Sequence, residues 1–151
     1  MPPPCASFWL APDVASASLT RERVRSWLDD HGWPPDEAHD LVYAVSEAVT
    51  NAAEHAFRTP PPRPRPDPPS IWVDCRLHEH DDGREVRIVI RDNGCWKPAD
   101  ADRGFRGHGL TLSGAFVDTF RLATGVAGTT VELTGRITAA YPGRPRRRPR
   151  G

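Results

Sequence analysis

Proline is the residue that most restricts this chain, because many of its 17 prolines fall in two segments, residues 58–70 (RTPPPRPRPDPPS) and 141–151 (YPGRPRRRPRG). A proline lacks the backbone N–H and holds φ near about −65°, so neither segment can form a continuous helix or a central strand. We expect the first segment to be a stiff surface loop within one domain spanning residues 6–136. Residues 1–5 and the basic residues 137–151 are expected to be disordered.

Charge balance and cysteine spacing narrow the classes of function. Twenty basic residues balance 20 acidic ones, so the chain as a whole has no field that would draw it to nucleic acid or to an anionic membrane. Cys5, Cys75 and Cys95 are odd in number and lack the CxxC spacing, so we expect free thiols. Because no apolar run is long enough to span a membrane and no signal-peptide pattern is present, the sequence predicts a cytoplasmic protein.

Apolar spacing predicts a strand and two helices before the first proline-rich segment. Residues 6–11 are a short apolar stretch typical of a strand, and residues 19–30 place apolar side chains near helical spacing. The second helix is signalled by Pro-Pro-Asp-Glu at residues 34–37 and extends to about Phe57. Its apolar side comprises Leu41, Val45, Ala48 and Ala52.

Strand patterns dominate after the first proline-rich segment. Residues 71–77 alternate in polarity, and residues 86–90 follow an Asp-Asp-Gly turn, so an antiparallel hairpin is expected. Residues 117–123 and 129–134 predict a second hairpin, preceded by a short helix at residues 109–116. The fold class we expect is α+β, a two-layer sandwich with helices packed on one face of a mostly antiparallel mixed sheet.

The second predicted helix carries a polar stripe opposite its apolar one. The stripe comprises Asp40, Glu47, Asn51 and Glu54. A solvated helix face has this pattern too, but Glu47 and Asn51 place two chemically useful groups one turn apart. A glutamate carboxylate can accept a proton, and a carboxamide oxygen is a neutral hard ligand suited to Mg²⁺. The pair therefore indicates either a solvated face or the magnesium end of a nucleotide site.

The tripeptide Asp92-Asn93-Gly94 ends an apolar strand pattern. Asn-Gly is a common turn dipeptide, which is the simplest interpretation of this segment. A carboxylate at a strand end can also accept a hydrogen bond from the exocyclic amine of adenine, with Gly94 allowing the backbone to approach the ring. The same carboxylate would face the carbonyl oxygen of guanine unfavourably, so such a site would prefer ATP to GTP.

Residues 104–110 (GFRGHGL) form a glycine cluster that runs into the predicted helix at residues 109–116. Glycine clusters are common in loops, but the unpaired backbone N–H groups of a helix N-terminus also bind phosphate. The segment is not a Walker loop, because Gly-Lys-Ser/Thr occurs nowhere in the chain. It indicates either an ordinary loop or a phosphate-binding lid.

Taken in order, the motifs that contain Glu47 and Asn51, Asp92-Asn93-Gly94, Gly107-His108-Gly109-Leu110 and Gly128-Thr129-Thr130 resemble the GHKL ATPase superfamily and its Bergerat ATP-binding fold. The resemblance is closest to the stand-alone anti-sigma-factor serine/threonine kinases and covers residues 6–136. It implies ATP and Mg²⁺ as cofactors. It assigns the general base to Glu47, Mg²⁺ to Asn51, adenine contacts to Asp92, Gly94 and Thr130, and a triphosphate lid to Arg103, Gly107, His108, Gly109 and Leu110.

The resemblance also implies an activity and partners. Domains of this kind bind a sigma factor, phosphorylate a serine on an anti-sigma-factor antagonist protein and commonly form homodimers. The alternative is a non-catalytic, nucleotide-gated module that sequesters a transcription regulator, and nucleic-acid binding through residues 144–150 ranks last. One departure from the family pattern bears on turnover. Cys95-Trp96 stand where many relatives have another glycine, so the indole of Trp96 either caps the base or packs under the lid.

Overall fold

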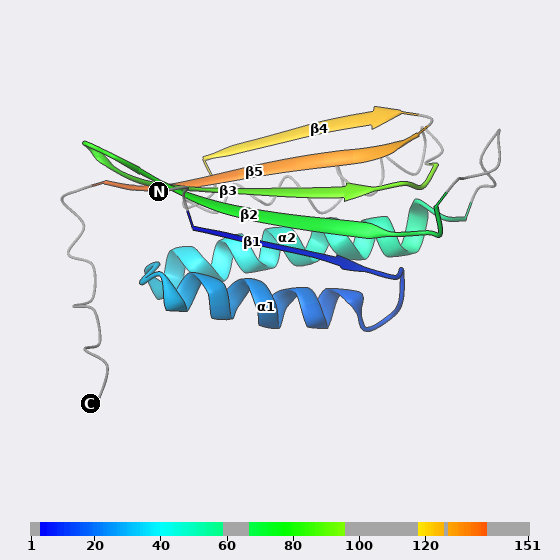
Figure 1. Ribbon diagram of the computed structural model, residues 1–151, viewed down its shortest axis with the longest axis horizontal. Helices are drawn as coiled ribbons and strands as arrows, with labels where there is room; N and C mark the ends of the chain where they lie inside the picture. The colour runs from blue at the N-terminus through cyan, green and yellow to red at the C-terminus, as the bar shows by residue number, and fades with distance from the viewer. Residues whose placement is uncertain (1–3, 59–66, 96–117, 126, 139–151) are drawn as a thin grey trace.

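A computed structural model describes residues 4–58, 67–95, 118–125 and 127–138 of the chain. Its elements are β1 (Cys5–Leu10), α1 (Ser16–Asp30), α2 (Pro35–His55), β2 (Ile71–His80), β3 (Gly83–Asp92), β4 (Thr119–Gly125) and β5 (Gly128–Thr138) (Figure 1). The lid residues named above, the helix expected at residues 109–116 and the basic tail from residue 139 onward lie outside the described residues.

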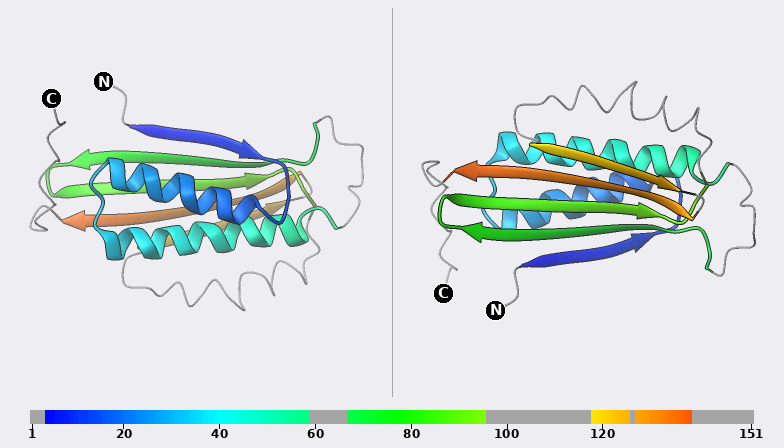
Figure 2. Two further views of the ribbon diagram at one scale, coloured as in Figure 1. Left: turned by 90° about the horizontal axis from the view of Figure 1, so that it is seen from below. Right: turned by 90° about the horizontal axis from the view of Figure 1, so that it is seen from above.

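The described strands form one sheet in the order β1-β2-β3-β5-β4, and each neighbouring pair among them is antiparallel. Both expected hairpins are present, with β2 pairing with β3 and β4 pairing with β5. The outer boundaries differ slightly from expectation, because β1 already includes Cys5 and β5 continues to Thr138. Figure 2 shows α1 and α2 side by side on one face of the sheet, which confirms the two-layer α+β prediction.

Helix α2 is built as its local sequence predicts. Pro35 occupies the first turn, where its missing N–H costs no hydrogen bond, and Asp36 and Glu37 follow it near the positive end of the helix dipole. His55 lies in the last turn, at the opposite end of that dipole. Among the described helices, none combines the length and apolarity that a membrane crossing requires.

The connection between the helices is set by one glycine. Gly32 has φ +68°, a conformation that favours glycine, and its N–H donates to the Asp29 carbonyl oxygen at 3.0 Å. The Trp33 N–H then donates to the Leu28 carbonyl oxygen at 2.9 Å, and the indole of Trp33 is buried. These bonds end α1 and turn the chain back, so that α2 runs beside it.

The core lies between α2 and the sheet. Its largest fully buried side chains include Leu28, Leu41, Val45, Val49, Ile71, Val73, Ile88 and Leu133. Burying a side chain of this size contributes about 1.5–3 kcal/mol, so the contact of α2 with strands β2, β3 and β5, together with the packing of α1 on α2, stabilises the sandwich. That contact also determines which end of α2 meets which strand ends.

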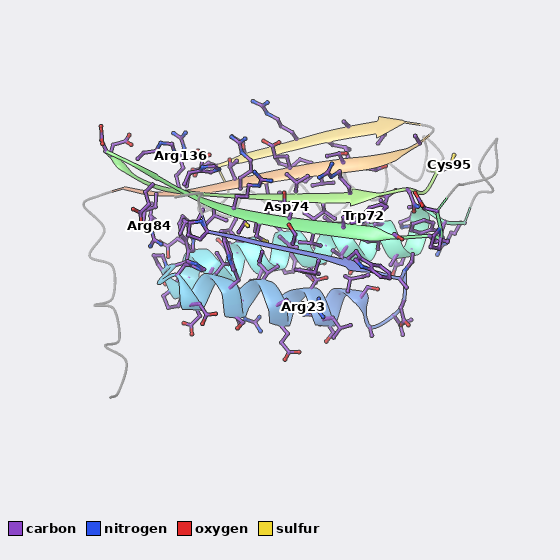
Figure 3. The ribbon with its side chains drawn as sticks, in the orientation of Figure 1. Arg23, Trp72, Asp74, Arg84, Cys95 and Arg136 are labelled. Atoms are coloured by element: carbon purple, nitrogen blue, oxygen red, sulfur yellow. The ribbon has the colours of Figure 1, made fainter. Side chains whose placement is uncertain are left out.

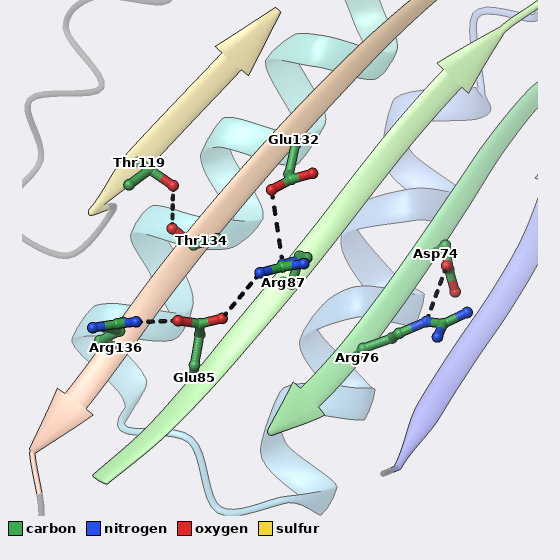
Figure 4. A network of polar contacts seen from close by, with 8 residues as sticks. All are labelled: Asp74, Arg76, Glu85, Arg87, Thr119, Glu132, Thr134 and Arg136. Carbon is green, nitrogen blue, oxygen red and sulfur yellow. Dashed lines mark hydrogen bonds and ion pairs between the residues drawn. The ribbon is translucent and has the colours of Figure 1, made fainter. Parts of the chain in front are cut away.

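The outer face of the sheet, opposite the helices, carries a network of ion pairs. Glu85 accepts a hydrogen bond from Arg136 Nε at 2.7 Å and lies 3.6 Å from Arg87, which also pairs with Glu132 at 3.7 Å (Figure 4). Burial opposes ionisation of Glu85, but the hydrogen bond and charge of Arg136, aided by Arg87 and His80, outweigh it and hold the pKa of Glu85 below its usual value. This network joins β3 to β5 across the exposed face.

Candidate functional site

The C-terminal half of α2 carries the two residues that the sequence singled out. Asn51 is 5% exposed, whereas Glu47, one turn earlier, is half-buried and reaches solvent. The neighbouring Ser46 accepts a hydrogen bond from Arg21 of α1 at 2.8 Å, so α1 covers a different side of the helix. At 100° per residue, Glu47 and Asn51 therefore lie on the flank turned away from α1.

The end of β3 meets the C-terminal end of α2. Asp92 is 7% exposed, and its Oδ1 accepts a hydrogen bond from the Gly94 N–H at 3.0 Å. A Cβ added to Gly94 would collide with the backbone carbonyl and side chain of Ala56, and the Cys95 N–H donates to that carbonyl at 2.6 Å. Figure 3 places Cys95 at this end of the molecule. The glycine thus brings the Asp92 segment to within about two helical turns of Asn51.

The beginning of β5 forms the next part of the same site. A Cβ on Gly128, which has φ +142°, would collide with the Asp92 carbonyl oxygen. Thr129 is the register partner of Asp92 and is 3% exposed, and its hydroxyl has no hydrogen-bond partner among the described residues. A buried hydroxyl without a partner costs about 1–3 kcal/mol, so its position beside Asp92 is suited to a polar ligand.

The family resemblance had placed Thr130 beside Asp92. In the structure Thr130 does not lie there. It pairs with Arg91, and residues paired across an antiparallel ladder share one face of the sheet, so Thr130 belongs to the outer face. Thr129 takes the expected position instead. The alternation of buried Val131 and Leu133 is a sequence signal that would have assigned Thr129 to the inner face.

Asn93 is a residue whose structural role the sequence did not reveal. Its carboxamide accepts a hydrogen bond from the Ser70 N–H at 2.8 Å and donates one to the Pro68 carbonyl oxygen at 2.9 Å. The dipeptide Asn93-Gly94 had been interpreted only as a turn or a backbone approach. Its side-chain partners lie more than 20 positions away in the sequence, and no local pattern identifies them.

A depression of about 830 Å³ lies on the outer face of the sheet, behind the Asp92 segment. Trp9, Trp72 and Arg91 line it, and Trp9 is 64% exposed; Figure 3 shows Trp72 and Asp74 on this face. The carboxylate of Asp92 shares the inner face with Ile71, its partner in β2. The depression nevertheless borders the site formed by α2, β3 and β5, because Asp92, Gly128 and Thr129 also contribute to its lining.

The described residues fit the adenine end of an ATP site. Because Gly94 and Gly128 have no Cβ, the chain at Gly94 can approach Ala56 and the chain at Gly128 can approach the Asp92 carbonyl. Asp92 and Thr129 supply buried side-chain oxygen atoms at this point. For Mg²⁺ the protein offers the side-chain oxygen of Asn51, and among the described residues no group of three or more His, Cys, Asp or Glu side chains is placed to hold a metal ion. A single protein ligand suits Mg²⁺, which keeps several waters and also binds phosphate oxygens.

The thiol of Cys75 does not contribute to this site. Cys75 points into the core, where burial, with a smaller contribution from the Asp74 charge, raises the pKa of its thiol to about 12. A thiol with so high a pKa is not a nucleophile near neutral pH. Cys5, Cys75 and Cys95 are all free thiols, as expected.

Comparison with known proteins agrees with this arrangement. The histidine kinase-like ATPase domain family matches residues 10–135, which include α2, the end of β3 and the start of β5. The chain is also similar to the crystal structure of the RsbU and RsbW domains of Rv1364c from Mycobacterium tuberculosis, with a TM-score of 0.64 and 28% sequence identity over 89% of this chain. It spans 33% of that longer chain. The protein therefore belongs to the histidine kinase-like ATPase domain family, within the GHKL superfamily that its motifs resemble, and membership in this family implies ATP binding.

Proposed function

We propose that this domain is an anti-sigma-factor serine/threonine kinase that uses Mg-ATP to phosphorylate an anti-sigma-factor antagonist. The observation that carries the proposal is the convergence of α2, β3 and β5 on Asp92, secured by the approach of Gly94 to Ala56 and of Gly128 to Asp92. The motif resemblance to anti-sigma-factor kinases and the similarity to a chain with an RsbW domain support the regulatory class.

In this proposal the strand ends bind the nucleobase. The Asp92 carboxylate accepts a hydrogen bond from the exocyclic amine of adenine, and the Thr129 hydroxyl supplies a second polar contact. Gly94 lines the ring with its backbone, and its lack of a Cβ lets this strand end pack against Ala56. Guanine presents a carbonyl oxygen where adenine has the amine, so the site favours ATP over GTP by repulsion as well as by attraction.

Helix α2 serves the phosphate end in the same proposal. The Asn51 oxygen is a ligand for Mg²⁺, which when bound neutralises charge on the phosphates. Glu47 accepts the proton of the substrate serine hydroxyl. The serine oxygen attacks the γ-phosphorus of ATP, and ADP departs as the bond between them breaks. Glu47 is half-buried, so its carboxylate is accessible to an incoming protein side chain. The triphosphate roles of Arg103, Gly107, His108, Gly109 and Leu110 remain predictions on residues outside the described part of the chain.

Substitution of Glu47 tests the catalytic role. Because general-base catalysis contributes about 10²–10⁴-fold, Glu47→Ala should lose that much phosphate transfer while retaining ATP binding. Isothermal titration measures binding, and labelled ATP with candidate antagonist proteins measures transfer. Glu54→Ala is the matched control, because it removes a carboxylate of the same helix that is exposed and pairs with His55. Transfer at the parent rate by Glu47→Ala would rule out the assigned role.

The same assay separates the kinase from its alternative. A parent protein that binds ATP and a transcription regulator but forms no phosphoprotein would be a nucleotide-gated module that sequesters its partner. The regulatory proposal places the protein in the cytoplasm, where ATP and sigma factors are found. A homodimer is part of the same proposal, and sedimentation at several protein concentrations measures it directly.

A further inference from the structure

We infer that Asn93 is a positioning residue for the nucleobase site, which holds the Asp92 carboxylate in place by joining the end of β3 to the residues before β2. The inference rests on the proposed ATP site and adds a residue that does not itself touch the nucleotide. It also gives a role to the C-terminal end of the proline-rich segment, residues 67–70.

Asn93 makes hydrogen bonds through three groups. Its side-chain Oδ1 accepts from the Ser70 N–H at 2.8 Å, and its Nδ2 donates to the Pro68 carbonyl oxygen at 2.9 Å. Its own backbone N–H donates to the Ser70 carbonyl oxygen at 3.3 Å. A carboxamide is the small side chain that offers an acceptor and a donor together, so asparagine satisfies both partners at once.

The proline content of the partner segment makes the side-chain bond necessary. Pro68 and Pro69 have no backbone N–H, so Ser70 carries the only backbone donor of this tripeptide, and Ser70 is buried. The regular β2–β3 register ends at the pair Ile71 and Asp92, one step before Ser70 and Asn93. At that next step the side-chain bond is 0.5 Å shorter than the backbone bond, 2.8 against 3.3 Å. Asn93 thus continues the strand pairing where proline would otherwise end it.

Two connections therefore follow Asp92 in the chain. Asn93, the next residue, binds the segment before β2, and the Cys95 N–H donates to the carbonyl oxygen of Ala56, just after α2. The Asp92 Oδ1 accepts a hydrogen bond from the Gly94 N–H at 3.0 Å, so the direction of the carboxylate depends on where the backbone after Asp92 lies. Asn93 belongs to that backbone and shares one planar peptide unit with Asp92. Loss of the Asn93 hydrogen bonds would free the peptide unit between Asp92 and Asn93 from the segment before β2. The Asp92 carboxylate could then move relative to the adenine ring.

The test compares ATP with purine riboside triphosphate, an analogue that lacks the 6-amino group. The dissociation constant of the analogue divided by that of ATP reports the contact between Asp92 and the amine. A general loss of the site weakens both ligands equally and leaves this ratio unchanged. For Asn93→Ala we expect ATP affinity to fall about tenfold, which is the size of one hydrogen bond to a charged group. Affinity for the analogue should change much less, so the ratio should approach one.

Two further variants make the measurement specific. Ser70→Ala removes the bond from the Ser70 hydroxyl to the Pro68 carbonyl oxygen but keeps the Ser70 N–H, so it should preserve the parent ratio. Asn93→Asp keeps the size and the acceptor but replaces the donor to Pro68 with a second oxygen, so it should lower the ratio as Asn93→Ala does. Because Asn93→Asp is nearly isosteric, it keeps the test open if Asn93→Ala fails to fold.

Each outcome distinguishes the positioning role from the proposed function. A parent protein that binds ATP and the analogue equally would contradict the adenine site itself. If the parent discriminates between the ligands and both Asn93 variants do so equally well, Asn93 does not position Asp92. Equal weakening of both ligands would show a purely structural role, and it too would overturn the inference.

Discussion

Replacement of Gly94 by alanine is the most direct test of how the site is assembled. The glycine lies where β3 meets α2, and a Cβ there would overlap the carbonyl oxygen, carbonyl carbon and Cβ of Ala56. Two of these atoms belong to the helix backbone and cannot move independently. The strand end and the helix end must therefore separate, which also stretches the 2.6 Å hydrogen bond from the Cys95 N–H to the Ala56 carbonyl oxygen.

The expected loss of stability follows from these two effects. Overpacking of a filled interior costs about 1–3 kcal/mol, and weakening of one buried backbone hydrogen bond adds about 0.5–1.5 kcal/mol. The free energy of unfolding of Gly94→Ala should fall by about 2–4 kcal/mol, a large share of the roughly 5–15 kcal/mol of a typical domain. For a chain of this size the midpoint of thermal unfolding should fall by roughly 5–15 °C.

Urea unfolding followed by circular dichroism measures the change. Gly125→Ala is the matched control, because the nearest atom to an added Cβ there is 3.8 Å away and that glycine does not have a positive φ. It should change the free energy of unfolding by less than about 0.5 kcal/mol. ATP binding, measured on the folded protein, should weaken in Gly94→Ala and stay at the parent level in Gly125→Ala. Equal unfolding midpoints for the two variants would refute the close approach of β3 to α2.

Three further predictions follow from burial and charge. Thr129→Val removes a hydroxyl that has no partner among the described residues, so the free energy of unfolding should hold or rise by about 1 kcal/mol, while ATP affinity measured by titration should fall about tenfold. The pKa of Glu85 is lowered from its ordinary 4.5, so its stabilisation is complete above that pH and is lost as the pH falls through the folded-state pKa. Glu85→Gln should therefore destabilise the protein at neutral pH, by about 1 kcal/mol since the partner Arg136 is solvent-exposed, and the difference from the parent in urea midpoints should shrink below pH 4.5. Leu41→Ala should cost about 2–5 kcal/mol of unfolding free energy because it empties a fully buried core position, and a loss below 1 kcal/mol would contradict that packing.

Local sequence was sufficient for most elements of the fold. The proline pair and acidic first turn located the start of α2, and its apolar stripe identified the side that packs on the sheet. The Asp-Asp-Gly turn located the first hairpin, and the glycines at 125 and 128 located the second. These features are short-range, because helix capping and turn formation depend on residues only a few positions apart.

The motifs also indicated the family, but their chemistry remained ambiguous until the strands and helices were assembled. Glu47 and Asn51 have the pattern of a solvated helix face, and Asp92-Asn93-Gly94 has the pattern of an ordinary turn. Their association depends on the contact of Gly94 with Ala56, two residues far apart in the chain. A contact of this kind arises from packing of α2 on the sheet, and no local rule contains it.

The sequence by itself therefore determined the elements, their turns and the residue types available for a nucleotide site. Tertiary structure decided which of those residues meet. A shift of one residue in strand register moves every side chain to the opposite face, and this is why Thr129 rather than Thr130 lies beside Asp92. For the same reason the partners of Asn93 and the burial of Glu85 depend on pairing between distant strands, whose register is set by the whole core.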